Sequence, residues 1–146
     1  MNLSIEVSRK ISRAYNAMCK PLCKELELSQ TAFDILMFLG NNPNYNTAGE
    51  IVEIRRIKAN LVSVNVERLV REGYLLRKQV EGDRRKTGLI CTDKAKPIIE
   101  RGRKLQKAFT ERMFLNMDDD LRKAFSEATD IIEKNLNEIL KAENKL

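Results

Sequence analysis

The sequence predicts a mainly α-helical fold that carries one small β-hairpin. Apolar residues recur every three or four positions over most of the chain, which is the period of an amphipathic helix. Two glycines, Gly82 and Gly88, enclose a charged cluster that lies between two strand-like runs, as is typical of a hairpin. Short helix-end signals separate the periodic stretches, and the chain contains no low-complexity linker.

Length and composition bound the class of protein. The chain has 146 residues, of which 42% are hydrophobic and 33% are charged, so it can bury the core of one ordinary domain. No apolar run approaches the roughly 20 residues needed to cross a bilayer. Three cysteines in a chain of this size do not make a disulfide framework. We therefore expect a cytoplasmic protein that does not enter a membrane.

The first two helices are predicted from apolar spacing and from their end signals. Residues 3–27 follow a helical period, and Pro21 within them predicts a kink or a break near Cys19-Lys20. Ser29 is the N-cap of a second helix, which should end at Gly40 and the Asn-Asn-Pro that follows. The apolar positions of these helices are Val7, Ile11, Tyr15, Met18, Leu22, Leu26, Leu28, Phe33, Ile35, Leu36 and Leu39.

Two closely spaced helices should follow. Thr47 and Glu50 form a T-x-x-E capping box for a short third helix, which fades at Arg55-Arg56. A fourth helix runs from about Lys58 to Glu72, and Gly73 closes it. Two helices joined by a few residues, the second of them amphipathic, are what a helix-turn-helix requires. The inner stripe of the fourth helix consists of Val62, Val66, Leu69 and Val70.

A β-hairpin should come directly after this helix pair. Residues 74–81 and 89–92 are strand-like, and the predicted tip between them contains Asp83-Arg84-Arg85-Lys86. A tip with three cations and one anion suits a phosphate backbone or a narrow, electronegative groove. A helix followed by a basic hairpin is the layout of a winged helix. We therefore place a winged helix-turn-helix, DNA-binding region at residues 29–96.

Two long helices should complete the chain. Thr92-Asp93 is predicted to cap the fifth, which reaches about Leu115, and Asp118-Asp119-Asp120 supplies anions at the start of the sixth.

The first helix and the last two carry apolar stripes that one small winged-helix unit cannot cover. A second copy of the chain would cover them, so residues 1–27 and 97–146 are predicted dimerisation helices. Packing of these helices on each other within one chain is the alternative. The stripe of the sixth helix consists of Leu121, Phe125, Ala128, Ile132, Leu136, Ile139 and Leu140.

The distribution of charge indicates a polyanionic partner. Residues 55–104 hold 15 Lys and Arg against six Asp and Glu, whereas the net charge of the whole chain is only +6. When the inner stripe of the fourth helix faces the core, its outward side chains can meet base edges in double-stranded DNA. Glu67 also faces outward and disfavours a phosphate at its own position. The predicted DNA contacts are Lys58, Asn60, Ser63, Val64, Arg68 and Arg71 on the recognition helix and Asp83, Arg84, Arg85 and Lys86 on the wing.

The chain resembles the MarR family of winged-helix regulators over nearly all of its length. The likeness rests on the capped second helix, the T-x-x-E helix, the run from Leu61 to Tyr74, the wing pattern D-x-R at Asp83 and Arg85, and the segment 90–95 after the wing. It implies a single MarR-type domain over residues 1–146. It also implies a dimeric repressor that binds an inverted-repeat operator and is released by a small aromatic or phenolic ligand, or by thiol oxidation. In the family, the arginine that matches Arg85 enters the minor groove, and the aspartate that matches Asp83 helps to hold it.

Two positions depart from the family pattern. The family usually places Ser or Thr at the entrance to the recognition helix, where this chain has Lys58-Ala59. We therefore expect the first turn of this helix to be capped differently. Cys91 stands where leucine is usual, which predicts a loss of packing rather than of function.

Cys19 and Cys23 are the candidates for a thiol sensor. Lys20 and Lys24 lie near them in sequence and would favour the reactive thiolate. A disulfide between the two is unfavourable, because Cβ atoms four residues apart on a helix are about 5–6 Å apart. The interpretation that we favour is that both are small buried hydrophobic residues.

An enzyme is not expected. The chain contains no histidine, no Cys/His zinc pattern and no phosphate-binding loop motif, so we predict neither a metal nor a cofactor. A winged-helix module that binds proteins instead of DNA is the remaining alternative, besides a thiol-based redox sensor.

Overall fold

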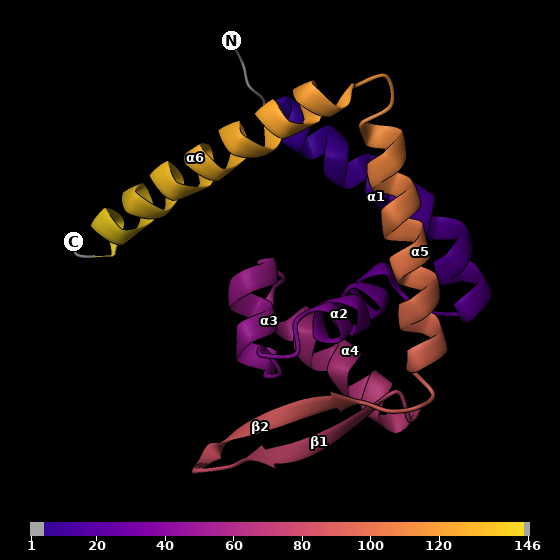
Figure 1. Cartoon of the computed structure of the whole chain (residues 1–146). Helices are drawn as coiled ribbons and strands as arrows, with labels where there is room; N and C mark the ends of the chain where they lie inside the picture. Colours follow the sequence, from indigo (N-terminus) through magenta and orange to yellow (C-terminus); the bar gives the residue numbers. More distant parts are fainter. Residues whose placement is uncertain (1–4, 145–146) are drawn as a thin grey trace. The chain divides into compact units, whose positions relative to one another are not determined.

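The computed structural model describes residues 5–144, except the side chains of residues 83–86, and confirms a mainly α-helical fold with one hairpin (Figure 1). It divides into two compact units, residues 1–109 and residues 110–146. None of the described helices is long and apolar enough to span a membrane. The elements are α1 (Ile5–Leu26), α2 (Gln30–Asn41), α3 (Ala48–Arg55), α4 (Ala59–Arg71), β1 (Leu75–Val80), β2 (Asp83–Cys91), α5 (Lys96–Met113) and α6 (Asp119–Glu143).

Helix α2 forms the centre of the first unit. Seven of its 12 residues are buried, so it is covered around most of its circumference rather than along one stripe. Its predicted ends are confirmed: the Ser29 Oγ accepts a hydrogen bond from the Ala32 N–H at 3.0 Å, and the Asn42 N–H donates to the Phe38 carbonyl. Four other elements of the first unit pack around it, namely α1, α4, β2 and the first part of α5.

Helix α1 runs without interruption through Pro21, so the predicted break is wrong. Proline removes one backbone N–H and therefore one helical hydrogen bond. Cys19, Leu22 and Cys23, on both sides of it, are buried in the same core as α2. This packing holds the helix together across the missing bond.

Helices α3 and α4 form the predicted helix-turn-helix. The capping box is confirmed, since the Glu50 N–H donates to the Thr47 Oγ1 and the Thr47 N–H donates to the Glu50 carboxylate, both at 3.2 Å. Arg56 ends α3 in a left-handed conformation, with φ at 54°. Gly73 closes α4 at φ 85°, as expected of a C-terminal glycine.

The hairpin is confirmed, but its tip differs from the prediction. Strands β1 and β2 pair antiparallel, and the chain turns at Glu81-Gly82, where Gly82 has φ 85°. The charged residues 83–86 therefore belong to β2 instead of a longer tip loop. Gly82 alone supplies the positive φ that a tight turn requires. The register shifts between Gln79 and Val80, so that residues 84–86 have no partner in the ladder.

The fifth helix begins later than the sequence indicated. It starts at Lys96, and Thr92-Asp93 does not cap it. The Thr92 hydroxyl instead donates to the Gly73 carbonyl at 2.6 Å, and Asp93 pairs with Lys96 at 2.7 Å. Thr92 thus closes the base of the hairpin, because the carbonyl at the end of α4 lies within its reach.

The second unit contains the end of α5 and α6. The Asp118 carboxylate caps α6 by accepting a hydrogen bond from the Leu121 N–H at 2.8 Å, as the sequence indicated. Arg122 donates to the Phe114 carbonyl at 3.1 Å, and the Phe114 and Phe125 rings meet edge to face. Among the described residues of α6 none is buried, so its apolar stripe is exposed along the whole helix.

We expect Gly102→Ala to destabilise the protein by about 1–3 kcal/mol. A methyl group at this buried position of α5 would collide with the Met37 side chain and approach the Phe33 ring to 3.0 Å, so the buried Met37 side chain or α5 itself would have to shift. Gly49→Ala is the control, because only the Thr47 Oγ1 lies within 4.0 Å of the added carbon. That helical substitution should be neutral or stabilise by up to about 1 kcal/mol. Urea denaturation measures both, and a Gly102→Ala variant as stable as wild type would contradict this packing.

Candidate nucleic-acid interface

The candidate site is the outward face of α4 together with the hairpin. The helix turns its inner stripe into the core, as predicted, although Val70 is only partly buried. On the opposite face the side chains reach solvent, and Val64 has 67% of its surface exposed. The exposed residues at the start and on the outward face of α4 include Lys58, Asn60, Ser63, Val64, Glu67 and Arg71.

The start of α4 lacks a side-chain cap. Lys58 occupies the N-cap position and makes no capping hydrogen bond, which confirms that this turn differs from the family pattern. The positive end of the helix dipole and the Lys58 ammonium both raise the local potential. A phosphate would be stabilised at such a helix start.

One flank of α4 is bound to the turn between α1 and α2. The Ser29 hydroxyl donates to the Asn65 Oδ1 at 2.8 Å, and the Arg68 guanidinium donates to the Glu27 carbonyl at 2.7 Å. Arg68 also pairs with Glu72 at 3.1 Å. Of the predicted DNA contacts, Arg68 is therefore engaged within the protein. One of its two partners, the Glu27 carbonyl, lies 41 residues away in the sequence and could not be identified from a helical pattern.

The other flank of α4 is bound to the hairpin. The Arg77 guanidinium on β1 donates to the Glu67 carboxylate at 3.0 Å. The Lys94 ammonium donates to the Glu72 carbonyl at 2.7 Å and lies 4.3 Å from the centre of the Tyr74 ring. These contacts fix the base of the hairpin to the recognition helix.

The free edge of β2 is bound to the segment before α3. The Leu89 N–H donates to the Asn46 carbonyl at 2.6 Å, and Thr47 forms a bridge to Gly88. Gly88 is buried, and a Cβ there would lie 3.2 Å from the Lys78 carbonyl, so the backbones approach closely because the residue is glycine. The direction of the wing is thus set by both helices of the helix-turn-helix.

Asp83, Arg84, Arg85 and Lys86, the predicted wing contacts, lie outside the described side chains. Their backbone belongs to β2, next to the Glu81-Gly82 turn. The chain therefore brings this basic stretch to the end of the hairpin, while its contacts stay a prediction.

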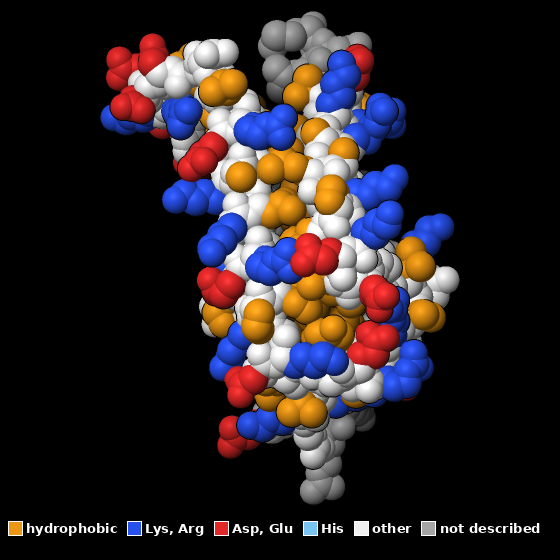
Figure 2. Space-filling model, turned by 90° about the vertical axis from the view of Figure 1, so that its right-hand side faces the viewer, with side chains coloured by type: hydrophobic (Ala, Val, Ile, Leu, Met, Phe, Trp, Pro, Cys, Tyr) orange, Lys and Arg blue, Asp and Glu red, His pale blue; other side chains and the backbone are white. Residues whose placement is uncertain are grey.

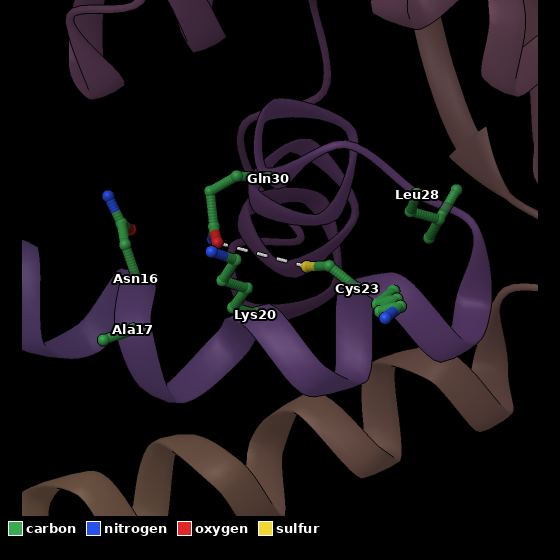
Figure 3. Close-up of a pocket in the computed structure, with 7 residues that line it drawn as sticks. Asn16, Ala17, Lys20, Cys23, Leu28 and Gln30 are labelled. Carbon is green, nitrogen blue, oxygen red and sulfur yellow. Dashed lines mark hydrogen bonds between the residues drawn. The ribbon is translucent and has the colours of Figure 1, made fainter.

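An open hollow of about 620 Å³ lies between α1 and the start of α2 (Figure 3). Two lysines and two amides line it together with a thiol and apolar carbon. It could accept a small molecule with an anionic group and an apolar body. The lining residues are Asn16, Ala17, Lys20, Cys23, Lys24, Leu28 and Gln30.

The two cysteines of α1 are buried free thiols. Burial raises the pKa of Cys19, and it raises the pKa of Cys23 to about 11. This is the opposite of the effect expected from Lys20 and Lys24, because both lysines are exposed to solvent and burial of the thiols disfavours the charged thiolate. The Cys23 Sγ lies 4.0 Å from the Gln30 Oε1 (Figure 3). Burial and pKa both favour a packing role.

Within the described residues, no group of three or more cysteine, aspartate and glutamate side chains could hold a metal ion.

Thiol alkylation should be slow in the native protein. At pH 8 a pKa of about 11 leaves Cys23 with a thiolate fraction about 100-fold smaller than that of an ordinary cysteine. Because the pKa is raised, the rate should increase with pH well beyond the range in which a free thiol has already ionised. Mass spectrometry of iodoacetamide-treated protein, with urea-unfolded protein as the control, measures this. Rapid native labelling of Cys19 or Cys23 at pH 7 would instead support a sensor.

The comparisons with known proteins agree with this geometry. Residues 26–86 match the model of the MarR family. A MarR protein from Peptoclostridium difficile is 26% identical, over 97% of this chain and 92% of that one, with a TM-score of 0.79. A MarR transcriptional regulator from Methanosarcina mazei is 20% identical, over 92% and 96%, with a TM-score of 0.76.

A MarR-type protein from Listeria monocytogenes, solved in complex with a 26mer DNA, is 18% identical over 93% of this chain and 90% of that one, with a TM-score of 0.80. No curated protein sequence matches the chain. The family match covers the winged-helix region, and the solved structures share the fold along nearly the whole chain. The resemblance is therefore confirmed over the winged-helix region: residues 26–86 match the MarR family, and the chain shares the winged-helix fold of solved MarR-family structures.

Proposed function

We propose that the protein is a sequence-specific, DNA-binding transcriptional regulator that acts as a dimeric repressor in the cytoplasm. The observation that carries this proposal is the state of α4. Hydrogen bonds and ion pairs hold it on both flanks, whereas on its outward face Glu67, which pairs with Arg77, is the one described residue that takes part in them. Among the described residues, Asn60, Ser63 and Arg71 form no hydrogen bond or ion pair through their side chains. A helix that is held rigidly, and whose outward polar side chains are free to form hydrogen bonds, is suited to recognising DNA bases.

Each outward side chain has a role that its chemistry fits. Asn60 can form two hydrogen bonds with adenine, and the exposed Val64 can pack on a thymine methyl group. Ser63 can bond a base or a phosphate. Lys58 and Arg71, near the two ends of the helix, suit phosphates or, for Lys58, guanine. We assign the DNA-binding region to residues 29–96, with Arg68 as a residue that holds α4 in place.

The wing completes the interface in this proposal. Arg85 would enter the minor groove, with Asp83 holding it and Arg84 and Lys86 meeting the backbone. The excess of cations over residues 55–104 supports this arrangement, because it supplies the attraction for phosphates. The Listeria structure, which contains DNA, supports it further.

A homodimer follows from the uncovered apolar surface. On α1, Ile5, Val7 and Ile11 are exposed, and α6 exposes its stripe throughout. Figure 2 shows hydrophobic side chains reaching the surface on the face where α1 lies. Large exposed apolar surfaces mark interfaces. Residues 1–27 and 97–146 would form the dimer, and two wings related by two-fold symmetry would match an inverted repeat.

The hollow beside α1 is the proposed place for a small aromatic or phenolic effector. Its lysines, Lys20 and Lys24, suit a carboxylate or phenolate, and Leu28 suits the ring. Leu28 lies between Glu27 and Ser29, which hydrogen-bond Arg68 and Asn65 of α4. A ligand that displaced this turn would disturb the recognition helix. The buried, weakly acidic thiols make the redox-sensing alternative the weaker one.

The DNA contacts can be separated by two alanine variants. Asn60→Ala should cost about 1–3 kcal/mol on the operator and much less on random DNA, because it loses a base contact. Arg85→Ala should weaken binding to operator and to A/T-rich duplexes alike, because minor-groove width is not specific to one sequence. Competition binding against operator and other duplexes measures the effect of each variant. Repeated at several salt concentrations, it should show a steep fall in affinity as the salt concentration rises. Absence of DNA affinity in a folded wild-type dimer would favour the protein-interaction module.

The dimer can be tested at α6. Leu136→Glu places a charge on the exposed apolar stripe and should convert the dimer to a monomer, since the charge would be buried without a partner at the interface. Lys134→Glu, on the opposite face of the same helix, is the control and should remain dimeric. Sedimentation equilibrium gives the mass, and circular dichroism confirms the helices. A monomeric wild-type protein at micromolar concentration would contradict the dimer.

A further inference from the structure

We propose that Glu67 reads a cytosine in the major groove and that Arg77 positions it. The Glu67 carboxylate would accept a hydrogen bond from the exocyclic amino group of the base. This inference rests on the proposed DNA-binding function and adds a base-specific contact to it.

The position of Glu67 on α4 is the first argument. Asn60, Val64, Glu67 and Arg71 follow one another at intervals of four, three and four residues, so they form one row along the helix. This row is opposite the buried stripe. Glu67 has 65% of its side chain exposed, in the middle of the row. A groove that receives Asn60 and Val64 also receives Glu67.

The charge of Glu67 is the second argument. A carboxylate is repelled by phosphates, so it cannot be one of the backbone contacts that give a DNA-binding surface its affinity. Its surroundings from residue 55 to residue 104 are rich in Lys and Arg. In the major groove the base edges offer hydrogen-bond donors only at the amino groups of cytosine and adenine, and Asp or Glu characteristically pairs with cytosine.

The contact with Arg77 is the third argument. The Arg77 guanidinium bonds the Glu67 Oε2 at 3.0 Å, whereas the Oε1 has no hydrogen-bond partner among the described residues. One oxygen is thus fixed by the hairpin and the other is left for a ligand. The guanidinium also offsets the repulsion between the carboxylate and neighbouring phosphates. Arg77 therefore orients the Glu67 carboxylate without contacting the base itself.

Selection of bound duplexes from a random library tests the inference with the full-length protein. Wild type should enrich a cytosine at one position of each half-site. Glu67→Gln should reduce that preference about tenfold and leave the other positions unchanged. Arg77→Ala should weaken the same preference to a smaller extent. Glu72→Gln is the matched control, because it removes one negative charge from the end of the same helix at a side chain held by Arg68. It should change affinity without changing base preference.

The outcomes separate the inference from the function on which it rests. An enriched wild-type motif in which Glu67→Gln changes no position would overturn the base contact and leave DNA recognition standing. If Arg77→Ala weakened binding to all DNA sequences equally, the positioning role of Arg77 would be overturned. If wild type enriches no sequence at all, the proposed sequence-specific function itself is wrong. Glu67 is exposed, so these substitutions leave the core intact.

Discussion

Burial of α2 is the constraint on which the rest of the first unit depends. A helix that is apolar on most sides cannot exist at a surface, so it must be enclosed by other elements. Its Met37 and Phe33 side chains approach α5 so closely that a Cβ at position 102 would collide with the Met37 side chain. Val62 and Leu69 of α4 belong to the same core. The face that α4 turns outward is therefore determined by what it must cover inside.

Most of the fold could be predicted from the sequence because its helix ends are encoded locally. Ser29, Thr47 with Glu50, and Gly73 each act within one helical turn, and each has the role expected from its type. The predictions that proved wrong concern residues whose structure depends on contacts with distant parts of the sequence. Thr92 was expected to cap a helix, but a carbonyl 19 residues earlier in the chain takes its hydroxyl. The break at Pro21 is absent because its neighbours are buried.

The candidate site was predictable only in part, for the same reason. The helical period identifies which side chains of α4 face outward, and Asn60 and Val64 are exposed as expected. It contains no information about partners on other elements, so it could not separate Arg68, which binds the Glu27 carbonyl, from Arg71, which stays exposed. The packing role expected for Cys23 agrees with its burial and raised pKa, whereas the thiolate-favouring effect of the nearby lysines does not appear, because a sequence shows charge but not desolvation.

The bond between the Leu89 N–H and the Asn46 carbonyl has a consequence for the order of folding. It joins two segments with the whole helix-turn-helix between them, so its formation closes a long loop and carries the entropy cost of that closure. Contacts of this kind form after local ones. We therefore expect the hairpin to dock after the helices have formed. Hydrogen exchange at the Leu89 amide reports whether the wing is docked, separately from the stability of the helical core.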